Sequence, residues 1–194
     1  MKVVFVMVDV NKRILWLDVE TTGVDAQVDS LLQVACIVTD SALNILHDKG
    51  FERKVFYSAD QVEKLKSLTD DYVVNMHEST GLWSSLPVDG VSLSRISDEL
   101  CGYIDTWVDS SYKARLGGNS ITLDRNFIEV NLPDVFSRLN YRSYDMSSVG
   151  GFFDLFAPDV KKFEKKGTHD ALDDIRESIA EAQYYAKFLK KISV

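Results

Sequence analysis

An apolar segment at residues 13–20, R-I-L-W-L-D-V-E, restricts the possible folds more than any other part of the chain. Its branched and aromatic residues predict a core strand, and a turn around Gly23 ends it. Two more strand-like segments follow before any helical pattern, at 31–40 and at 53–57. Three consecutive strands favour an antiparallel meander as the first part of a sheet.

The rest of the sequence alternates between helical periodicity and short strands. A helical stretch begins at 69–77, and apolar residues recur three and four positions apart over 93–107. The segment 124–130 predicts a further helix, while 115–118 and 141–145 predict short strands. A long C-terminal helix has one apolar stripe, made of Leu172, Ile175, Ile179, Ala182, Ala186 and Leu189. This order predicts an α/β fold with a mixed sheet flanked by helices.

The composition indicates one domain and limits the possible partners. The chain has 194 residues, three prolines and no Pro/Gly/Ser-rich linker, so we expect a single domain over 13–194. Residues 1–12 open with an apolar stretch that lacks the cleavage pattern of a secretory signal, and we expect a short N-terminal extension there. The formal net charge of −8 disfavours a broad basic surface that could grip long nucleic acid. A nucleic-acid substrate would therefore be short, and metal ions would neutralise much of its charge.

The cysteines and the lengths of the apolar runs bear on the compartment. Cys36 and Cys101 lie among apolar neighbours in a strand-like and a helix-like segment, so we expect two buried, reduced thiols. No apolar run is long enough to span a bilayer, and no membrane partner is expected. We expect a cytoplasmic protein, or a mitochondrial one if the source is eukaryotic.

The first chemical signal is the motif D-V-E-T-T-G at 18–23. Because side chains alternate along a strand, Asp18 and Glu20 should point to the same face. Two carboxylates this close repel each other, and a divalent cation between them would relieve the repulsion. A strand that becomes polar where it leaves the sheet would show the same D-x-E pattern, and this alternative stays open for the motif alone.

Two further acids stand at helix starts. Asp124 follows the small polar turn G-N-S-I at 118–121, where a partner of the helix dipole is the simpler interpretation. The long C-terminal helix carries Asp173 and Asp174 near its start, where an exposed acidic turn is common. At about 100° per residue, Asp174 lies about 110° from the centre of the apolar stripe and Asp173 about 150°. Asp174 should therefore face the sheet, while His169 should lean over the site from the loop or the first turn.

Together these residues suit a two-metal site for phosphoryl transfer. The set comprises Asp18, Glu20, Asp124, Asp174 and His169. Two Mg²⁺ ions about 4 Å apart can hold the attacking water and the leaving oxygen of an in-line displacement. The four carboxylates would bind the metals. Histidine side chains titrate near neutrality, so His169 would act as the general base.

The same residues resemble the DEDDh exonuclease superfamily, whose three motifs contain D-x-E, a second Asp and H-x4-D. Within it the sequence is most similar to the oligoribonuclease family, over almost the whole chain. The matching segments are W-L-D-V-E-T-T-G (16–23), V-T-D-S-A-L-N-I-L (38–46), M-H-E-S-T-G-L (76–82), G-N-S-I-x-x-D-R-x-F (118–127), Y-R-x-x-D-x-S-S (141–148) and G-T-H-x-A-L-D-D-I-R-E-S-I-A-E (167–181).

The resemblance implies a ribonuclease H-like fold with a mixed five-stranded sheet, and a homodimer with a shared active site. It implies a 3′→5′ exoribonuclease that hydrolyses very short single-stranded oligoribonucleotides to mononucleotides with two Mg²⁺ or Mn²⁺ ions. A DEDDh exonuclease of the proofreading or ribonuclease T type, acting on longer DNA or RNA 3′ ends, is the alternative. An adaptor that has lost the chemistry is less favoured, because all five catalytic positions hold competent residues.

The resemblance also assigns residues to substrate binding. Val24 stands where the family usually has a leucine that wedges between two bases. His77 and Ser120 would help to hold the substrate. Four residues would cap it from the neighbouring subunit: Tyr141, Arg142, Ser147 and Ser148. Simpler interpretations exist, since Tyr141 is equally a strand aromatic and a histidine at a polar helix end is ordinarily solvated.

Overall fold

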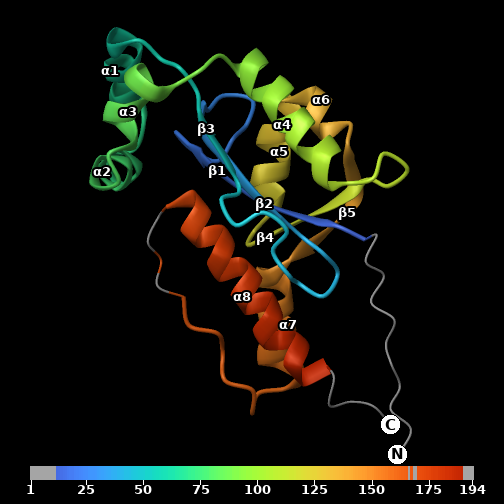
Figure 1. The fold of residues 1–194 in the computed structure, drawn as a ribbon. Helices are drawn as coiled ribbons and strands as arrows, with labels where there is room; N and C mark the ends of the chain where they lie inside the picture. Colours follow the sequence, from blue (N-terminus) through green and yellow to red (C-terminus); the bar gives the residue numbers. More distant parts are fainter. Residues whose placement is uncertain (1–11, 166, 168–169, 190–194) are drawn as a thin grey trace, which may run out of the picture.

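The computed structural model describes residues 12–165, 167 and 170–189. Its centre is a five-stranded sheet in the order β3-β2-β1-β4-β5 (Figure 1). The strands are β1 (Ile14–Thr21), β2 (Leu31–Thr39), β3 (Phe51–Lys54), β4 (Ala114–Gly118) and β5 (Leu139–Asp145). β1, β2 and β3 pair antiparallel, whereas β4 and β5 run parallel to β1. The predicted mixed sheet is confirmed. The expected extension lies outside the described residues except for Lys12.

The predicted meander is present, but its third strand is shifted. β3 covers 51–54, whereas the sequence predicted a strand at 53–57. Val55 makes only an isolated bridge, to Val91, and Ser58 already caps the helix that follows. The prediction was wrong at this strand because helix capping takes the chain out of the sheet early.

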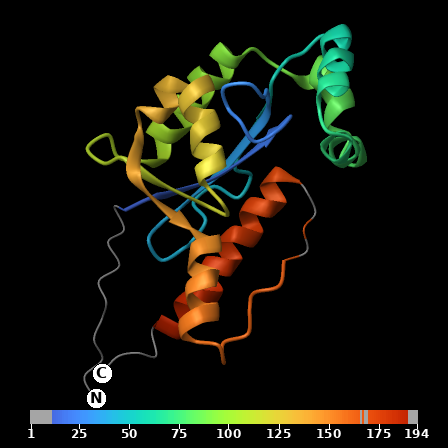
Figure 2. The same cartoon turned by 180° about the vertical axis from the view of Figure 1, so that it is seen from behind.

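Helices cover both faces of the sheet (Figures 1 and 2). One face is covered by α4 (Leu93–Trp107), α5 (Thr122–Asn131) and α6 (Pro133–Phe136). The other is covered by α7 (Met146–Phe156) and α8 (Ala171–Leu189). A small lobe beside the sheet is formed by α1 (Ala59–Leu68), α2 (Asp71–Ser79) and α3 (Leu82–Asp89). In the described part of the chain, no helix is long and apolar enough to cross a bilayer.

β1 contributes to a different hydrophobic core on each face, because its side chains alternate. The odd-numbered residues from Leu15 to Val19 pack in the cluster that α4, α5 and α6 cover. The even-numbered Trp16 packs with α7 and α8. The next even-numbered residues are Asp18 and Glu20, so the strand directs both carboxylates towards the α8 side.

The apolar stripe predicted for the C-terminal helix is confirmed over its first turns. Ile175 and Ile179 are buried, whereas Leu189 is 61% exposed in the last turn, at the end of α8 that lies away from the sheet (Figure 1). Tyr185 is buried instead, because its ring stacks on Phe153 of α7 at 4.6 Å. The two cysteines are buried free thiols, as predicted.

Candidate active site

The end of β1 and the start of α5 hold three of the predicted acids in one place. Asp18 and Glu20 lie near the carboxyl end of the strand. Asp124 is only 5% exposed, and its Oδ1 accepts a 2.9 Å hydrogen bond from the backbone N–H of Val19. β4 pairs with β1 only through residues 14–16, so Asp124 reaches the strand where β4 has stopped pairing. α5 is thereby fixed to the strand that carries the other two acids.

α8 contributes the fourth acid. Asp174 is half-buried in the first turn, and its charge acts on both Asp18 and Glu20. Asp173 is exposed and pairs with Arg176 at 3.3 Å. The two orientations agree with the angular argument from the helix. The metal-binding role of Asp174 remains a prediction.

The segment before α8 contains the predicted general base. His169 lies outside the described residues. Its neighbour Asp170 accepts a 3.0 Å hydrogen bond from the backbone N–H of Asp173, and its charge acts on Glu20. His169 is therefore next in sequence to a residue whose charge acts on the acid cluster. The role of His169 in proton transfer stays a prediction.

Burial and mutual repulsion raise the pKa values of the clustered acids. The pKa of Asp18 lies well above its ordinary value because the side chain is desolvated and other carboxylates are close. Burial and neighbouring acids, Asp174 first, raise the pKa of Glu20 to about 8. Burial raises the pKa of Asp124 to about 7. Carboxylates in such surroundings ionise readily only when a positive charge compensates them.

The donor set fits hard divalent cations, because carboxylate oxygens are the ligands that Mg²⁺ and Mn²⁺ prefer. Within the described ranges, no three acidic, histidine or cysteine side chains already surround one point closely enough to hold an ion. Without a cation, mutual repulsion disfavours a closer approach of the carboxylates. Cation binding would have to draw the side chains together.

His77 is covered by protein. Its ring is 1% exposed, and Nε2 donates a 2.9 Å hydrogen bond to the carbonyl oxygen of Thr21. Nδ1 lies 3.8 Å from Oε2 of Glu20, and the ring meets that of Trp83 edge-on. The interpretation of His77 as a solvated helix-end residue was wrong, because α3 packs over it. His77 thus lies beside Glu20, and its contact with substrate stays a prediction.

The turn after β4 brings Ser120 to the start of α7. The backbone N–H of Ser120 donates to Oδ1 of Asp145 at 3.2 Å and to Oγ of Ser147 at 3.1 Å. Asp145 also caps α7 by accepting from the N–H groups of Ser147 and Ser148. The resemblance assigned Ser147 and Ser148 to a cap from the neighbouring subunit. In the structure Ser147 contacts Ser120 of its own chain.

Tyr141 and Arg142 lie on β5, an edge strand of the sheet. Tyr141 is 74% exposed, and the guanidinium of Arg142 lies 4.9 Å from the centre of its ring. Among the described residues, no hydrogen bond or ion pair joins either side chain to the carboxylate cluster. The structure therefore does not bring these two residues to the acids of their own chain.

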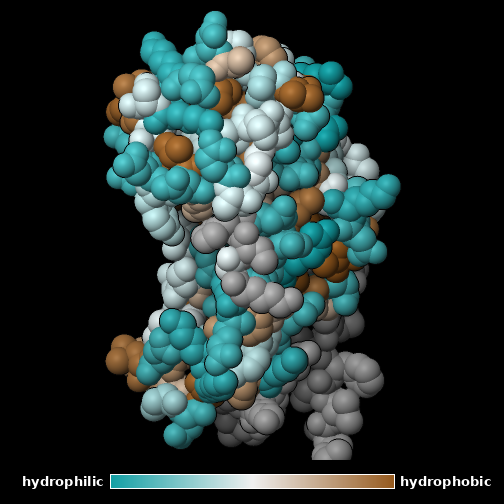
Figure 3. Space-filling model, turned by 90° about the vertical axis from the view of Figure 1, so that its left-hand side faces the viewer, coloured by the Kyte–Doolittle hydropathy of each residue, from teal (hydrophilic) through white to brown (hydrophobic). Residues whose placement is uncertain are grey.

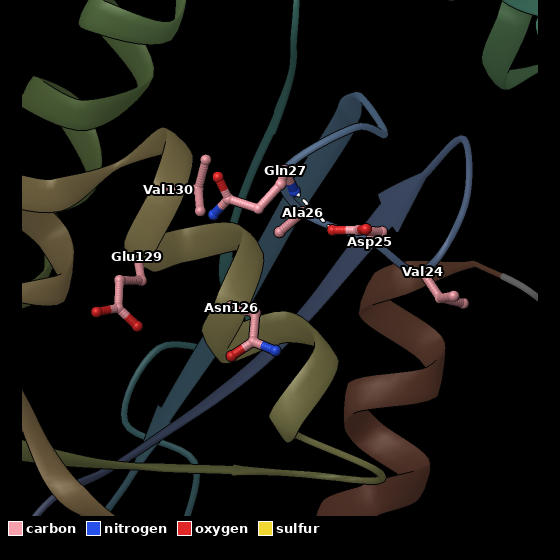
Figure 4. A pocket seen from close by; sticks show the side chains of 7 residues that line it. All are labelled: Val24, Asp25, Ala26, Gln27, Asn126, Glu129 and Val130. Carbon is pink, nitrogen blue, oxygen red and sulfur yellow. Dashed lines mark hydrogen bonds between the residues drawn. The ribbon is translucent and has the colours of Figure 1, made fainter.

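Val24 lies in the loop between β1 and β2 and is 78% exposed. Asp29 stiffens this loop by accepting a 2.9 Å hydrogen bond from the backbone N–H of Asp25. A cavity of about 500 Å³ separates the loop from α5, and its lining is Val24, Asp25, Ala26, Gln27, Asn126, Glu129 and Val130. Figure 4 shows the side chain of Val24 pointing away from the α5 residues of this cavity.

Comparison with known proteins identifies the family. A model of the exonuclease family matches residues 15–182. The oligoribonuclease of Corynebacterium glutamicum (strain R) is 37% identical over 179 residues, which cover 91% of this chain and 80% of that protein. The oligoribonuclease of Vibrio cholerae is 34% identical over 183 residues, which cover 94% of this chain and 98% of that protein. The chain belongs to the oligoribonuclease family of 3′→5′ exonucleases.

The fold of this oligoribonuclease-family chain also occurs in larger exonucleases. The zinc-bound complex of E. coli exonuclease I with single-stranded DNA has a TM-score of 0.72 at 16% identity. An exonuclease I from Methylocaldum szegediense has a TM-score of 0.71 at 18% identity. Each match covers 93% of this chain but only 42% and 41% of those chains. The likeness confirms the predicted ribonuclease H-like exonuclease fold.

Three polar residues of this oligoribonuclease-family site were missed by the sequence analysis. Nδ2 of Asn119 donates to Oγ of Ser178 at 2.8 Å and to Oε2 of Glu181 at 3.2 Å. Ser178 and Glu181 follow Asp174 by four and seven positions, so the three share one face of α8. That spacing is visible in the sequence and could have revealed Ser178 and Glu181, but not Asn119.

Proposed function

We propose that the protein releases 5′-mononucleotides from the 3′ end of very short single-stranded RNA, in a hydrolysis that depends on two divalent cations, Mg²⁺ or Mn²⁺. The observation that carries the proposal is the meeting of four acids from β1, α5 and α8, whose charges act on one another. Family membership supplies the class of reaction. The four acids are the proposed metal ligands, namely Asp18, Glu20, Asp124 and Asp174.

Cations bound at these carboxylates would activate the attacking water and offset negative charge on the scissile phosphate and the leaving oxygen. The protein's own contribution is to hold the four metal-binding side chains in place. Asp124 is tied to the backbone of β1, Glu20 is backed by His77, and Asp174 is carried by the first turn of α8. His169 would accept the proton from the attacking water.

Several features support a short substrate. The net charge of −8 leaves little basic surface for an extended phosphate backbone. Val24 is 78% exposed on its loop and would separate two neighbouring bases. Ser120 and Ser148 lie at the junction of the turn after β4 with α7, and their hydroxyls would donate to a phosphate. These contacts would together hold about one dinucleotide.

We further propose a homodimer in which each subunit completes the site of the other. Three aromatic or apolar residues of α7 are exposed, namely Phe152, Leu155 and Phe156. In Figure 3, hydrophobic side chains project at the lower end of the molecule, which α7 and α8 occupy in Figure 1. Exposed apolar patches of this kind are typical of interfaces. Tyr141 and Arg142 of a partner subunit would then cap the substrate with an aromatic ring and a cation.

Hydrolysis of longer DNA or RNA 3′ ends is the second candidate. The cavity of about 500 Å³ beside Val24 offers room for further nucleotides. Exonuclease I of E. coli, which has a similar fold, was crystallised with single-stranded DNA. However, Asp25 and Glu129 line this cavity and would repel a phosphate backbone there. We therefore favour the short substrate.

One assay separates the two candidates. Purified protein is given 5′-labelled RNA and DNA of two, three, seven and twenty nucleotides with Mg²⁺, and kcat/KM is measured for each. The proposal expects the highest kcat/KM for RNA of two or three nucleotides and no turnover in excess chelator. A steady rise up to twenty nucleotides would support the second candidate, and undiminished hydrolysis in chelator would contradict the metal mechanism.

A further inference from the structure

A polar line runs along the buried side of α8. Asp174, Ser178 and Glu181 are spaced four and three residues apart, so they stack on one side of the helix. Ser178 and Glu181 are each 5% exposed, among buried residues that are otherwise mainly apolar. A carboxylate this deeply buried is costly unless its partners compensate it, so its contacts show what it does.

Glu181 is bound to two residues from other segments. Its Oε2 accepts a 3.2 Å hydrogen bond from Nδ2 of Asn119, which also donates to Ser178. The ammonium of Lys165 lies 3.3 Å from the same oxygen, and the two side chains are 32% and 7% exposed. Lys165 compensates the buried charge, and Asn119 connects it to the turn after β4.

The contacts continue from Asn119 to the substrate side of the site. Oδ1 of Asn119 accepts a 3.1 Å hydrogen bond from Oγ of Ser147. That hydroxyl in turn accepts from the backbone N–H of Ser120 at 3.1 Å. Asn119 donates through Nδ2 on one side and accepts through Oδ1 on the other, so its two sides fix the orientation of the amide. A continuous series of hydrogen bonds therefore joins Glu181 to Ser120.

Ser120 needs such support because its backbone is left-handed. Its φ is +52°, a conformation that is unfavourable for residues with a side chain by about 1–2 kcal/mol. Residues in such conformations persist only where the surrounding structure holds them. The hydrogen bonds that the backbone N–H of Ser120 donates to Asp145 and Ser147 provide this support.

We infer that Glu181 is a positioning residue. It fixes the amide of Asn119, and through Asn119 and Ser147 it holds the left-handed turn that directs Ser120 towards the substrate. This inference rests on the proposed function for the statement that Ser120 contacts substrate. It concerns binding, because none of these residues belongs to the acids proposed to hold the metals.

The test compares kcat and KM for the RNA dinucleotide pApA with Mg²⁺. Glu181→Leu removes the acceptor and keeps the bulk, and Asn119→Ala removes the link. Each should raise KM about tenfold to a hundredfold and change kcat far less, the range expected for residues that orient a site. The double variant should be no worse than the more affected single variant, because both changes break one series. Glu181→Gln keeps an acceptor for Asn119 and should recover most of the loss.

The matched control is Glu164→Gln. Glu164 stands next to Lys165, but its carboxylate pairs with Lys161 and both side chains are largely exposed. This variant should retain the KM and kcat of the wild type. If Glu181→Leu does not fold, Asn119→Ala and Glu181→Gln carry the same comparison. An unchanged KM in folded Asn119→Ala would overturn the inference. So would a KM increase in the double variant that equals the product of the increases in the two single variants.

A second readout does not depend on turnover. The backbone amide of Ser120 should exchange its hydrogen faster in Glu181→Leu and in Asn119→Ala than in the wild type, because Ser147, one of its two acceptors, is released. If the wild type does not hydrolyse pApA, the proposed function has failed, and amide exchange alone decides whether Glu181 holds the turn. Unchanged amide exchange at Ser120 in both variants would overturn the inference about Glu181.

Discussion

At the scale of single residues, each acid of the cluster relies on a different neighbour. Asp124 accepts from the backbone of β1, Glu20 lies 3.8 Å from the ring of His77, and Asp174 is carried by the first turn of α8. None of these supports comes from another acid of the cluster. The arrangement therefore survives the repulsion between the carboxylates, and single substitutions should have separable effects.

The first prediction concerns adjacent acids. Asp174→Ala should lower kcat on the order of a hundredfold or more, since a proposed ligand of the cations that stabilise transition-state charge is lost. Asp173→Ala should keep most of the activity, because Asp173 is exposed and contacts Arg176. The measurement is kcat of both variants after circular dichroism shows that they are folded. An essential Asp173 would show that the assignment of the H-x4-D motif is wrong.

The second prediction concerns pH in the absence of metal. The raised pKa values of Glu20, about 8, and Asp124, about 7, mean that the folded state binds more protons than the unfolded state between about pH 5 and pH 8. In that window the free energy of unfolding falls as pH rises. Thermal melts in excess chelator should show a falling Tm, and saturating Mg²⁺ should remove most of the slope. A flat Tm in chelator would show that the acids are not crowded as described.

At the scale of elements, the junction between β5 and α7 does more than connect a strand to a helix. Asp145 ends β5, caps α7 and accepts from the backbone N–H of Ser120. One carboxylate thus sets the helix start and supports the turn after β4. Loss of this side chain should affect both stability and substrate binding.

The third prediction tests this double role. Asp145→Ala should lower the free energy of unfolding by about 1 kcal/mol, the usual cost of a lost N-cap, and should also raise KM for pApA. Ser92→Ala is the control, because Ser92 caps α4 by accepting from the backbone N–H of Arg95. It should cost similar stability with no change in KM. An Asp145→Ala variant with unchanged KM would limit the residue to capping.

The sequence predicted the helices and strands in which the spacing of apolar residues is regular over a short segment. The spacing in 93–107 predicted α4, and the apolar run at 13–20 predicted β1 to within one residue. α3 and α7 were missed, because α3 contains Pro87 and α7 carries two glycines among apolar residues on all sides. α1 and α6 were missed as well, and α1 has only Val62 fully buried.

The candidate site was predicted to a similar extent. Carboxylates that end a strand or begin a helix stand out in a sequence, so all four acids could be named from it. Asn119 could not be found in this way, because its role arises from contacts with Ser178 and Glu181 of α8, a segment distant in the sequence. His77 was named from a family resemblance, yet its burial beside Trp83 depends on how the α1–α3 lobe folds.

At the scale of the whole molecule, the exposed residues of α7 and β5 suggest how two chains would combine. Tyr141 and Arg142 lie on an edge strand and do not reach the acids of their own chain. An isologous dimer would place the same pair from each subunit at the site of the other. The acids and the cap of one site would then belong to different chains.

The fourth prediction uses this division. Asp18→Ala and Arg142→Ala homodimers should both be nearly inactive. Mixed, unfolded and refolded together, they should recover about a quarter of wild-type activity, because about half of the dimers are mixed and each has one intact site. Native mass spectrometry confirms that mixed dimers are present. If they are present without activity, Arg142 acts within its own subunit or has no role.

The hydrogen bond from the backbone N–H of Val19 to Asp124 provides a probe of cation binding. The amide proton of Val19 points at a carboxylate oxygen whose charge and orientation must change when a cation binds nearby. The NMR chemical shift of this amide proton should therefore change on titration with Mg²⁺, while the chemical shifts of amides in α4 should stay unchanged. Occupancy of the site could then be followed without substrate, in inactive variants and at any pH. Asp124→Asn keeps an acceptor for Val19 but lacks the charge, and would show how much of the shift the cation itself causes.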